Sequence, residues 1–180
     1  MFETETFLVE CEAALDESQP ALATKEALRR AVARPGDIDA ALGAAAQGGY
    51  RTLYRSPGLT VLQFVWPPGV SLFPHDHRMW AAIGIYGGKE DNTFFRRTPE
   101  GIQASGGKRL TTGDVVLLGD DVIHGVANPS DRYTAAIHVY GGDFFAKQRS
   151  QWDPVTLREA PFDPESVQRL LRNADERTQL

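Results

Sequence analysis

Three of the four histidines in the chain have the spacing of metal ligands. His75 and His77 lie two positions apart, and on a β-strand, where successive side chains alternate between faces, that spacing directs both imidazoles to one side. A turn signal at 67–69 precedes the apolar run that leads into this pair. His124 ends a second turn-bounded apolar run, 113–124, and the two strands can converge on one point. The sequence therefore predicts one divalent metal bound by His75, His77 and His124.

The fourth histidine, His138, lies two residues before Tyr140, so these two side chains are also expected to share one face of a strand. That arrangement would bring a phenol close to the metal. A buried tyrosine that merely hydrogen-bonds to a histidine is the alternative structural interpretation.

The glycines, histidines and asparagine of these segments resemble the two sequence motifs of the cupin family, whose members fold as double-stranded β-helix barrels. The residues that carry the resemblance are Gly69, His75, His77 and Gly88 in the first motif, and Gly113, His124 and Asn128 in the second. The glutamate that is usual in the first motif would fall at Ala81 or Ala82, and neither can bind a metal. A cupin with three histidines and no glutamate resembles the thiol dioxygenase branch of the family.

The neighbouring segments are similar to bacterial mercaptopropionate and cysteine dioxygenases. This resemblance covers about residues 48–147 and is carried by 64–66, 74–80, 83–84, 130–132 and 137–141. It implies iron(II), because three neutral ligands leave the ion dicationic and an anionic thiolate would then neutralise its charge. Zinc, nickel or manganese could also occupy such a site, and the residues alone do not choose among these metals.

The same resemblance implies catalytic roles for Tyr140 and His138 as the last two members of a serine-x-histidine-x-tyrosine relay. The serine position is Ala136, so the relay is one hydroxyl short and His138 is expected to find a backbone or water partner. Some cysteine dioxygenases join the tyrosine to a cysteine that follows the first motif. Cys11 is the only cysteine of this chain, so no such crosslink is expected.

An acidic substrate inside the barrel would need a cationic partner. Arg51 and Arg55 lie on the strand that carries a substrate-carboxylate contact in the resembled family, and a guanidinium offers two parallel N–H donors to a carboxylate. We expect one of these arginines, with Arg55 preferred, to face the metal, and Trp80 to line the pocket or the core. Either arginine could instead be a surface residue on an edge strand.

These features predict a non-haem iron(II) thiol dioxygenase that converts a small acidic thiol to its sulfinate with O₂. One alternative is another metal-dependent cupin enzyme, such as an isomerase, a lyase or a dioxygenase of non-thiol substrates. Another is a cupin domain that binds a metal without turnover. Cupins are often dimers, so the resemblance also makes a homodimer a candidate assembly.

Composition narrows the expected partners and compartment. A net charge of -5 and a pI near 5.4 give no reason to expect nucleic acid or an anionic membrane as a partner. The apolar runs are far shorter than the roughly 20 residues of a membrane-spanning helix, and residues 1–5 lack the features of a signal peptide. A single cysteine permits no internal disulfide. A cytoplasmic protein is therefore expected.

The pattern of elements predicts one mainly β domain with helices at both ends. Apolar residues at helical spacing indicate a helical cap in residues 1–47, and short β-rich runs indicate the cupin barrel in 48–147. Glycine pairs at 87–88 and 106–107 predict hairpin turns. The remaining residues, 148–180, are expected to form an irregular extension that ends in a short helix starting at 163–166.

Overall fold

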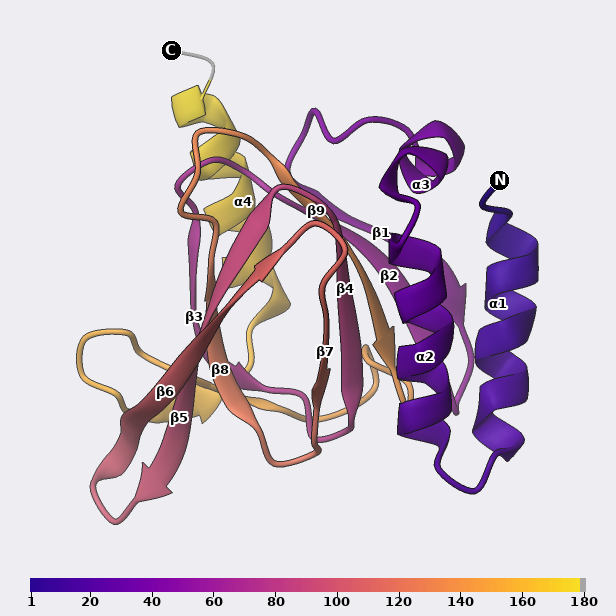
Figure 1. The fold of residues 1–180 in the computed structure, drawn as a ribbon. Coiled ribbons are helices and arrows are strands. Elements are labelled where there is room, and N and C mark those ends of the chain that lie inside the picture. The colour runs from indigo at the N-terminus through magenta and orange to yellow at the C-terminus, as the bar shows by residue number, and fades with distance from the viewer. Residues whose placement is uncertain (179–180) are drawn as a thin grey trace.

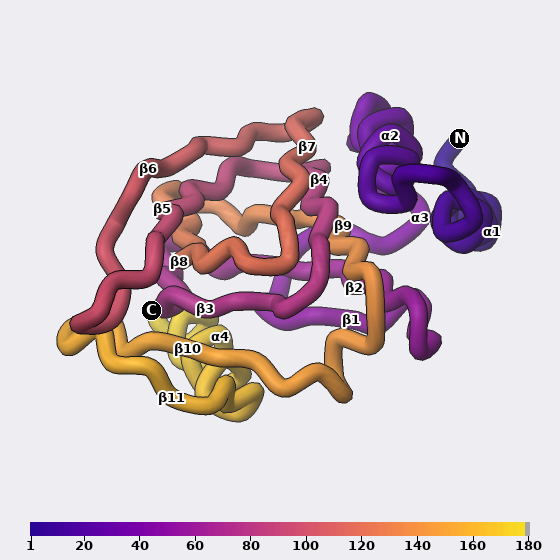
Figure 2. The backbone as a smooth tube through the Cα atoms, turned by 90° about the horizontal axis from the view of Figure 1, so that it is seen from below, coloured from indigo at the N-terminus to yellow at the C-terminus, as the bar shows by residue number. Residues whose placement is uncertain are grey.

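Two antiparallel sheets enclose the core in the computed structural model, which describes residues 1–178 (Figure 1). The first sheet has the order β1 (Gly49–Arg55), β2 (Thr60–Trp66), β9 (Thr134–Tyr140), β4 (Ala81–Gly87) and β7 (Val115–Leu118). The second has the order β11 (Glu159–Pro161), β10 (Ser150–Trp152), β3 (Ser71–Asp76), β8 (Ile123–Ala127), β5 (Lys89–Thr98) and β6 (Gly101–Thr111). Figure 2 shows these strands surrounding one interior space. The expected double-stranded β-helix is confirmed.

The central strands β2 and β9 are buried along their whole length, because both faces of the first sheet are covered. Alternate residues such as Leu62 and Phe64 point into the barrel, while Val61 belongs to an outer apolar layer. The helices α1 (Thr4–Ala13), α2 (Pro20–Val32) and α3 (Pro35–Leu42) cover that layer. The expected helical cap therefore packs on the outer face of the first sheet.

Close packing of this cap depends on a glycine. A Cβ atom at Gly84 would lie 2.8 Å from Cγ of Leu28 and 2.9 Å from Cγ1 of Val32. Both side chains are fully buried, so α2 can approach β4 only because residue 84 has no side chain. None of the helices within residues 1–178 is long and apolar enough to cross a membrane.

The helix α4 (Pro164–Thr178) contributes Val167, Leu171 and Ala174 to the interior of the barrel. It begins where the sequence predicts, with proline in its first turn, and has 15 residues. The buried carboxylate of Asp175 accepts hydrogen bonds from the N–H of Gly48 at 2.8 Å and from the Tyr133 hydroxyl at 3.0 Å. These bonds tie the helix to the barrel.

Three sequence predictions about strands and turns are wrong. Gly88 does not close a hairpin, because β4 and β5 belong to different sheets. The 106–107 glycine pair lies inside β6, next to a register shift against β5, and the β5–β6 hairpin turns at residues 99–100 instead. The C-terminal extension is not irregular, since β10 and β11 add to the edge of the second sheet beside β3. This addition brings residues of the extension to the mouth of the barrel.

Candidate metal site

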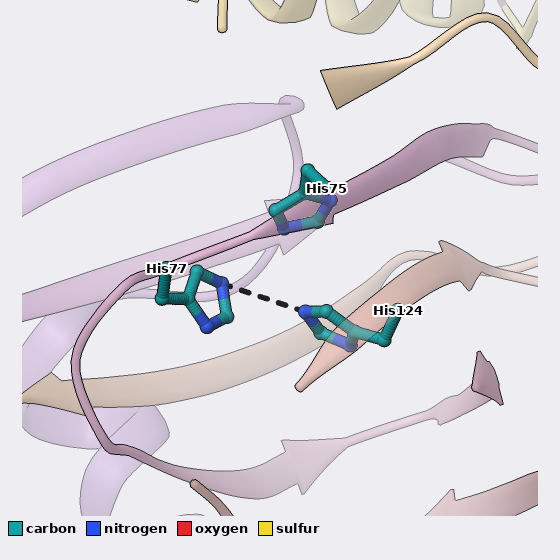
Figure 3. Close-up of side chains that lie close together, drawn as sticks. All are labelled: His75, His77 and His124. Atoms are coloured by element: carbon teal, nitrogen blue, oxygen red, sulfur yellow. Dashed lines mark hydrogen bonds between the residues drawn. The ribbon is translucent and has the colours of Figure 1, made fainter. Parts of the chain in front are cut away.

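The three predicted histidines come together inside the barrel (Figure 3). His75 lies near the end of β3, directly opposite His124 of β8, and His77 follows at the start of the next turn. One ring nitrogen from each lies within 4.8 Å of the other two, and the Nε2 atoms of His77 and His124 are 3.4 Å apart. All three side chains are buried. The arrangement could therefore bind a metal ion.

These histidines are in the protonation state that binds a metal cation. Burial lowers the pKa of His75 to about 4. The hydrogen bond to the Phe73 carbonyl acts in the opposite direction, and the positive charge of Arg149 lowers the pKa further. Burial, and after it the proximity of the other histidines, lowers the pKa of both His77 and His124 well below the usual value. All three rings are therefore neutral at pH 7, the form in which imidazole binds metals.

Two hydrogen bonds also fix which nitrogen is available. His75 donates from Nδ1 to the Phe73 carbonyl at 3.1 Å, and His124 donates from Nδ1 to Oδ1 of Asn92 at 2.7 Å. In both rings the lone pair of Nε2 is left for a ligand bond. The donor set thus fits a divalent ion with three nitrogen ligands.

Among the residues that the structure describes, no carboxylate joins the three histidines in place of the glutamate that is usual in the first motif. Ala81 points into the barrel on β4, opposite Tyr140, and Ala82 belongs to the outer layer. Cys11 also lies in the outer layer under the helical cap, where burial raises its thiol pKa to about 12. The thiol is therefore inert and separated from the histidines by the first sheet.

His138 and Tyr140 share the inner face of β9, and their side chains line the same cavity as the three histidines. The Tyr140 hydroxyl lies 2.9 Å from Nδ1 of His138, and the Tyr140 ring lies 5.1 Å from the His77 ring. Burial lowers the pKa of His138 to about 3 and raises the pKa of Tyr140 far above its usual value. The pair is therefore neutral at pH 7, and the phenol keeps its proton.

Nε2 of His138 is buried and has no hydrogen-bond partner within the part of the chain that the structure describes. Ala136, two residues earlier on the same inner face, has no hydroxyl to offer. The backbone partner expected for His138 is not found there, and its Nδ1 instead pairs with Tyr140.

The cavity that these residues share has a volume of about 60 Å³. That is room for roughly four water molecules, or for a ligand of a few non-hydrogen atoms. Most of its wall is apolar and is formed by Phe64, Trp66, Leu72, Val126, Phe144 and Phe162. A small ligand in this space would therefore contact mainly apolar side chains.

Arg149, which the sequence analysis missed, supplies the cation of this cavity. It precedes β10, and the pairing of Gln151 with His75 brings it to the barrel mouth. Its guanidinium carbon lies 3.9 Å from the ring centre of Phe144 and 4.0 Å from that of Phe162. Nε and Nη1 are buried without a hydrogen-bond partner among residues 1–178. Burial lowers its pKa, but a guanidinium keeps its charge in proteins.

The prediction that Arg51 or Arg55 faces the metal is wrong. Arg51 is exposed on the face of β1 opposite to Tyr50 and donates to the Leu42 carbonyl at 2.9 Å. Arg55, at the end of the strand, forms a surface ion pair with Asp143 at 2.9 Å. Neither side chain lines the cavity. Strand alternation decides the outcome for Arg51, because Tyr50 occupies the inward position.

Trp80 also lies outside the cavity, so of the two positions expected for it, the pocket wall and the core, the structure places it in the core. Its ring packs with the outer layer and covers the backbone of Gly141, where a Cβ atom would lie 2.1 Å from the indole. Asn128 of the second motif has a structural role. Its buried amide donates to the carbonyls of Trp66 and Arg132, at 3.0 and 2.7 Å, and closes the loop before β9.

No family model matches the chain. Among similar solved structures, BH2720 from Bacillus halodurans has a TM-score of 0.50 and 15% identity, over 58% of this chain and 76% of that one. An RmlC-like cupin family protein with a double-stranded β-helix fold from Methanocaldococcus jannaschii has a TM-score of 0.47 and 14% identity, over 57% and 86%. The DMSP lyase DddQ from Ruegeria pomeroyi has a TM-score of 0.49 and 18% identity, over 61% and 53%. Identities this low concern the fold alone and leave the reaction open.

Proposed function

We propose that the protein is an iron(II)-dependent thiol dioxygenase that converts a small thiol with a carboxylate group to its sulfinate, using O₂. One observation carries this proposal: the guanidinium of Arg149, whose Nε and Nη1 are buried without a partner among residues 1–178, lines the same small cavity as three neutral histidines. A buried charge without a partner is costly, so a cavity of this kind favours an anionic ligand. A carboxylate would accept hydrogen bonds from the free Nε and Nη1 donors of Arg149.

The aromatic residues around Arg149 hold it in place for this role. Phe144 and Phe162 lie over the guanidinium and restrict its motion, while both rings also line the cavity. Their surfaces exclude water, which strengthens the attraction between the guanidinium and a carboxylate. The cavity volume of about 60 Å³ limits the substrate to a short chain between its acidic group and the metal.

Iron bound by His75, His77 and His124 would supply the site for the thiolate and the redox chemistry with O₂. The resemblance of the two motifs to thiol dioxygenases supports the thiol and the iron. The neutral histidine set adds a physical reason, because an anionic thiolate compensates an ion that no carboxylate ligand has neutralised.

Tyr140 would act as a neutral hydrogen-bond donor beside the reacting group. Its raised pKa keeps the phenol protonated, and its pairing with Nδ1 of His138 holds the ring toward His77. If His138 carries its proton on Nδ1 and donates to the phenol oxygen, the Tyr140 O–H remains free to donate into the cavity.

The test begins with metal analysis of the protein purified without oxygen, followed by oxygen consumption with a panel of small thiols. We expect iron in the protein, and oxygen uptake with sulfinate formation for mercaptopropionate or cysteine but little for cysteamine and propanethiol, which lack a carboxylate. His75→Ala is the matched control and should lose both metal and oxygen uptake.

Iron-loaded protein that consumes no oxygen with any thiol would overturn the proposal and favour another metal-dependent cupin activity. Equal turnover of cysteamine and mercaptopropionate would contradict the selectivity for acidic thiols, while the proposal of thiol oxidation would stand.

A further inference from the structure

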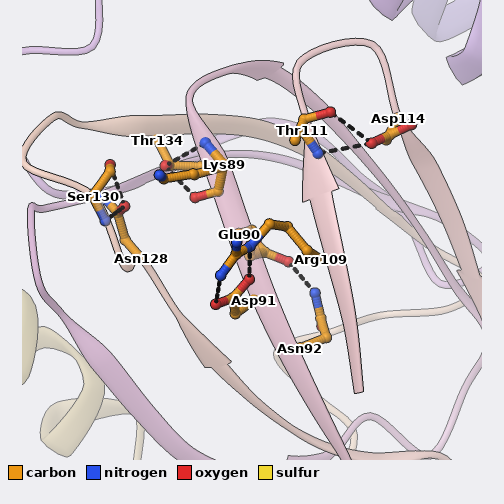
Figure 4. Close-up of polar contacts among 10 residues, drawn as sticks. All are labelled: Lys89, Glu90, Asp91, Asn92, Arg109, Thr111, Asp114, Asn128, Ser130 and Thr134. Carbon is orange, nitrogen blue, oxygen red and sulfur yellow. Dashed lines mark hydrogen bonds and ion pairs between the residues drawn. The ribbon is translucent and has the colours of Figure 1, made fainter. Parts of the chain in front are cut away.

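A chain of buried polar side chains leads from His124 to a carboxylate on the neighbouring strand. His124 donates to Oδ1 of Asn92 at 2.7 Å, and Nδ2 of Asn92 donates to Oε1 of Glu90 at 2.8 Å. Figure 4 shows the second of these bonds, between Glu90 and Asn92 on β5. All three side chains are almost completely inaccessible to solvent. A glutamate in this position is unusual, because acidic side chains are rarely buried without a partner cation.

Strand geometry explains why β5 presents these two residues to the interior. Glu90 and Asn92 are two positions apart and share the inner face, beside β8, where Phe94 is the direct partner of His124. Asp91 points the other way and forms a surface ion pair with Arg109 at 2.6 Å. The strand thus carries one carboxylate on each face, and only the outer one has a cationic partner that this structure describes.

The direction of the two hydrogen bonds determines the tautomer of His124. Glu90 accepts hydrogen bonds, so the amide nitrogen of Asn92 faces Glu90 and the amide oxygen faces the histidine. His124 must then carry its proton on Nδ1 and keep the lone pair of Nε2 for the cavity. Asn92 therefore transmits the orientation of Glu90 to the histidine.

The second carboxylate oxygen of Glu90 has no partner within residues 1–178, and the same is true of the indole Nε1 of Trp66. Burial raises the pKa of Glu90 to about 7, with Asn92 and Trp66 acting in the opposite direction. The other buried acid beside the histidines, Asp76, is already paired with Arg78 and Arg97. No cationic side chain within the described residues thus pairs with Glu90.

We propose that Asn92 and Glu90 are positioning residues for the metal site: Asn92 fixes the tautomer and orientation of His124, and Glu90 adds negative charge to an otherwise neutral ligand set. This inference rests on the proposed function only in that the three histidines bind a metal. A divalent cation at the histidines offsets the cost of the buried carboxylate, and the carboxylate in turn raises the affinity for the cation.

The test measures Co²⁺ and Zn²⁺ affinity of the metal-free protein by competition with a chelator, without any turnover. Asn92→Ala should weaken binding by about 10- to 100-fold, the range typical of partners that orient a ligand histidine. Glu90→Gln keeps an acceptor for Asn92 but removes the charge, and should weaken binding by several-fold to about tenfold. The matched control is Asp91→Asn, which removes one carboxylate from the adjacent position on the outer face and should leave affinity unchanged.

A second measurement separates positioning from a merely structural role. The urea midpoint of metal-free Glu90→Gln at pH 8 should equal or exceed that of the wild type, because an ionised buried carboxylate has been removed. A lower midpoint would show that Glu90 stabilises the fold and would overturn its assignment to the metal site. Wild-type affinities in both Asn92→Ala and Glu90→Gln would overturn the whole inference. Failure of the wild type itself to bind either ion would instead overturn the proposed function.

Discussion

The carboxylate of Asp76 accepts a hydrogen bond from the backbone N–H of Ser150 at 2.8 Å. Asp76 follows the candidate ligand His75, and Ser150 follows Arg149, so this bond joins the strand of the histidines to the segment that carries the cation. The other oxygen of Asp76 pairs with Arg78 at 2.7 Å and with Arg97 at 3.3 Å. One buried carboxylate thus fixes the distance between the two functional halves of the cavity.

Replacement of this carboxylate should loosen Arg149 without emptying the metal site. In Asp76→Asn the ion pairs with Arg78 and Arg97 are lost, and the bond from the Ser150 N–H is weakened because an amide oxygen is a poorer acceptor than a carboxylate, while the side chain keeps its size. We expect KM for mercaptopropionate to rise about tenfold, or about 1.4 kcal/mol, with metal content unchanged. Asp91→Asn serves as the control with unchanged KM. An equal rise for cysteamine would mean that Asp76 acts on the metal site and not on Arg149.

Arg149→Gln tests the anionic subsite directly. Loss of a charge-assisted hydrogen bond to a desolvated carboxylate should raise KM for mercaptopropionate by about 10- to 100-fold, and should affect cysteamine much less. Steady-state oxygen uptake with both thiols is the measurement. Arg55→Gln is the matched control, since its guanidinium pairs with Asp143 at the surface and should not affect either substrate.

The same Arg149 variant should not lose stability. A guanidinium with two unpartnered buried nitrogens costs free energy in the ligand-free protein, so its removal should leave the urea midpoint equal or higher. A midpoint well below that of the wild type would show that Arg149 holds the C-terminal segment in place. That outcome would assign it a structural role.

The metal ligands were predictable because their geometry follows from local rules. The two-residue spacing places His75, near the end of β3, and His77, just after it, on one side, and the antiparallel neighbour β8 brings His124 opposite His75. The start of the final helix could also be predicted from the sequence, since Pro164 marks its first turn. The outer position of Arg51 follows from the same alternation, but only once the inward orientation of Tyr50 is known.

Arg149 could not be found in this way, because its place depends on long-range pairing. The segment after Gly142 adds to β3 through a short strand, and the two rings that cover the guanidinium come from positions 144 and 162. The hydrophobic periodicity of a segment does not indicate that the chain returns to the edge of a distant sheet. The only sequence signal was a lone arginine directly before a strand of three residues.

Tyr140→Phe should lower turnover and leave the metal in place. The Tyr140 hydroxyl contacts His138, and within the described residues it forms no hydrogen bond with the three candidate ligand histidines. The variant therefore removes a donor from the cavity without disturbing the ligands. We expect kcat to fall by about 10²-fold or more, as for loss of other catalytic hydrogen-bond donors. Metal content and oxygen uptake are measured together. Loss of metal in the variant, or turnover at the wild-type rate, would contradict this role.

The metal-free protein should lose stability as the pH falls from 6.5 toward 4. His75 has a pKa of about 4 in the folded protein and 6.5 as its ordinary value, so the unfolded state binds more protons in this window. That difference corresponds to roughly 3 kcal/mol, fully lost below the lower pKa. His138, with a pKa of about 3, acts in the same direction. Glu90 acts in the opposite direction, because its raised pKa of about 7 makes the folded state bind more protons between pH 4.5 and 7.

The urea midpoint of chelator-treated protein, measured from pH 7 to pH 4, checks this balance. We expect the wild-type midpoint to fall with pH, because the histidines outnumber the one opposing carboxylate, and we expect Glu90→Gln to show the steeper fall because that carboxylate is gone. Saturating Zn²⁺ should raise the midpoint at pH 7 and lose this effect toward pH 4, where protons compete for the histidines. A wild-type midpoint that stays level or rises on acidification would mean that these histidines are not held neutral by burial. A shallower slope in Glu90→Gln would mean that the pKa of Glu90 is not raised in the folded protein.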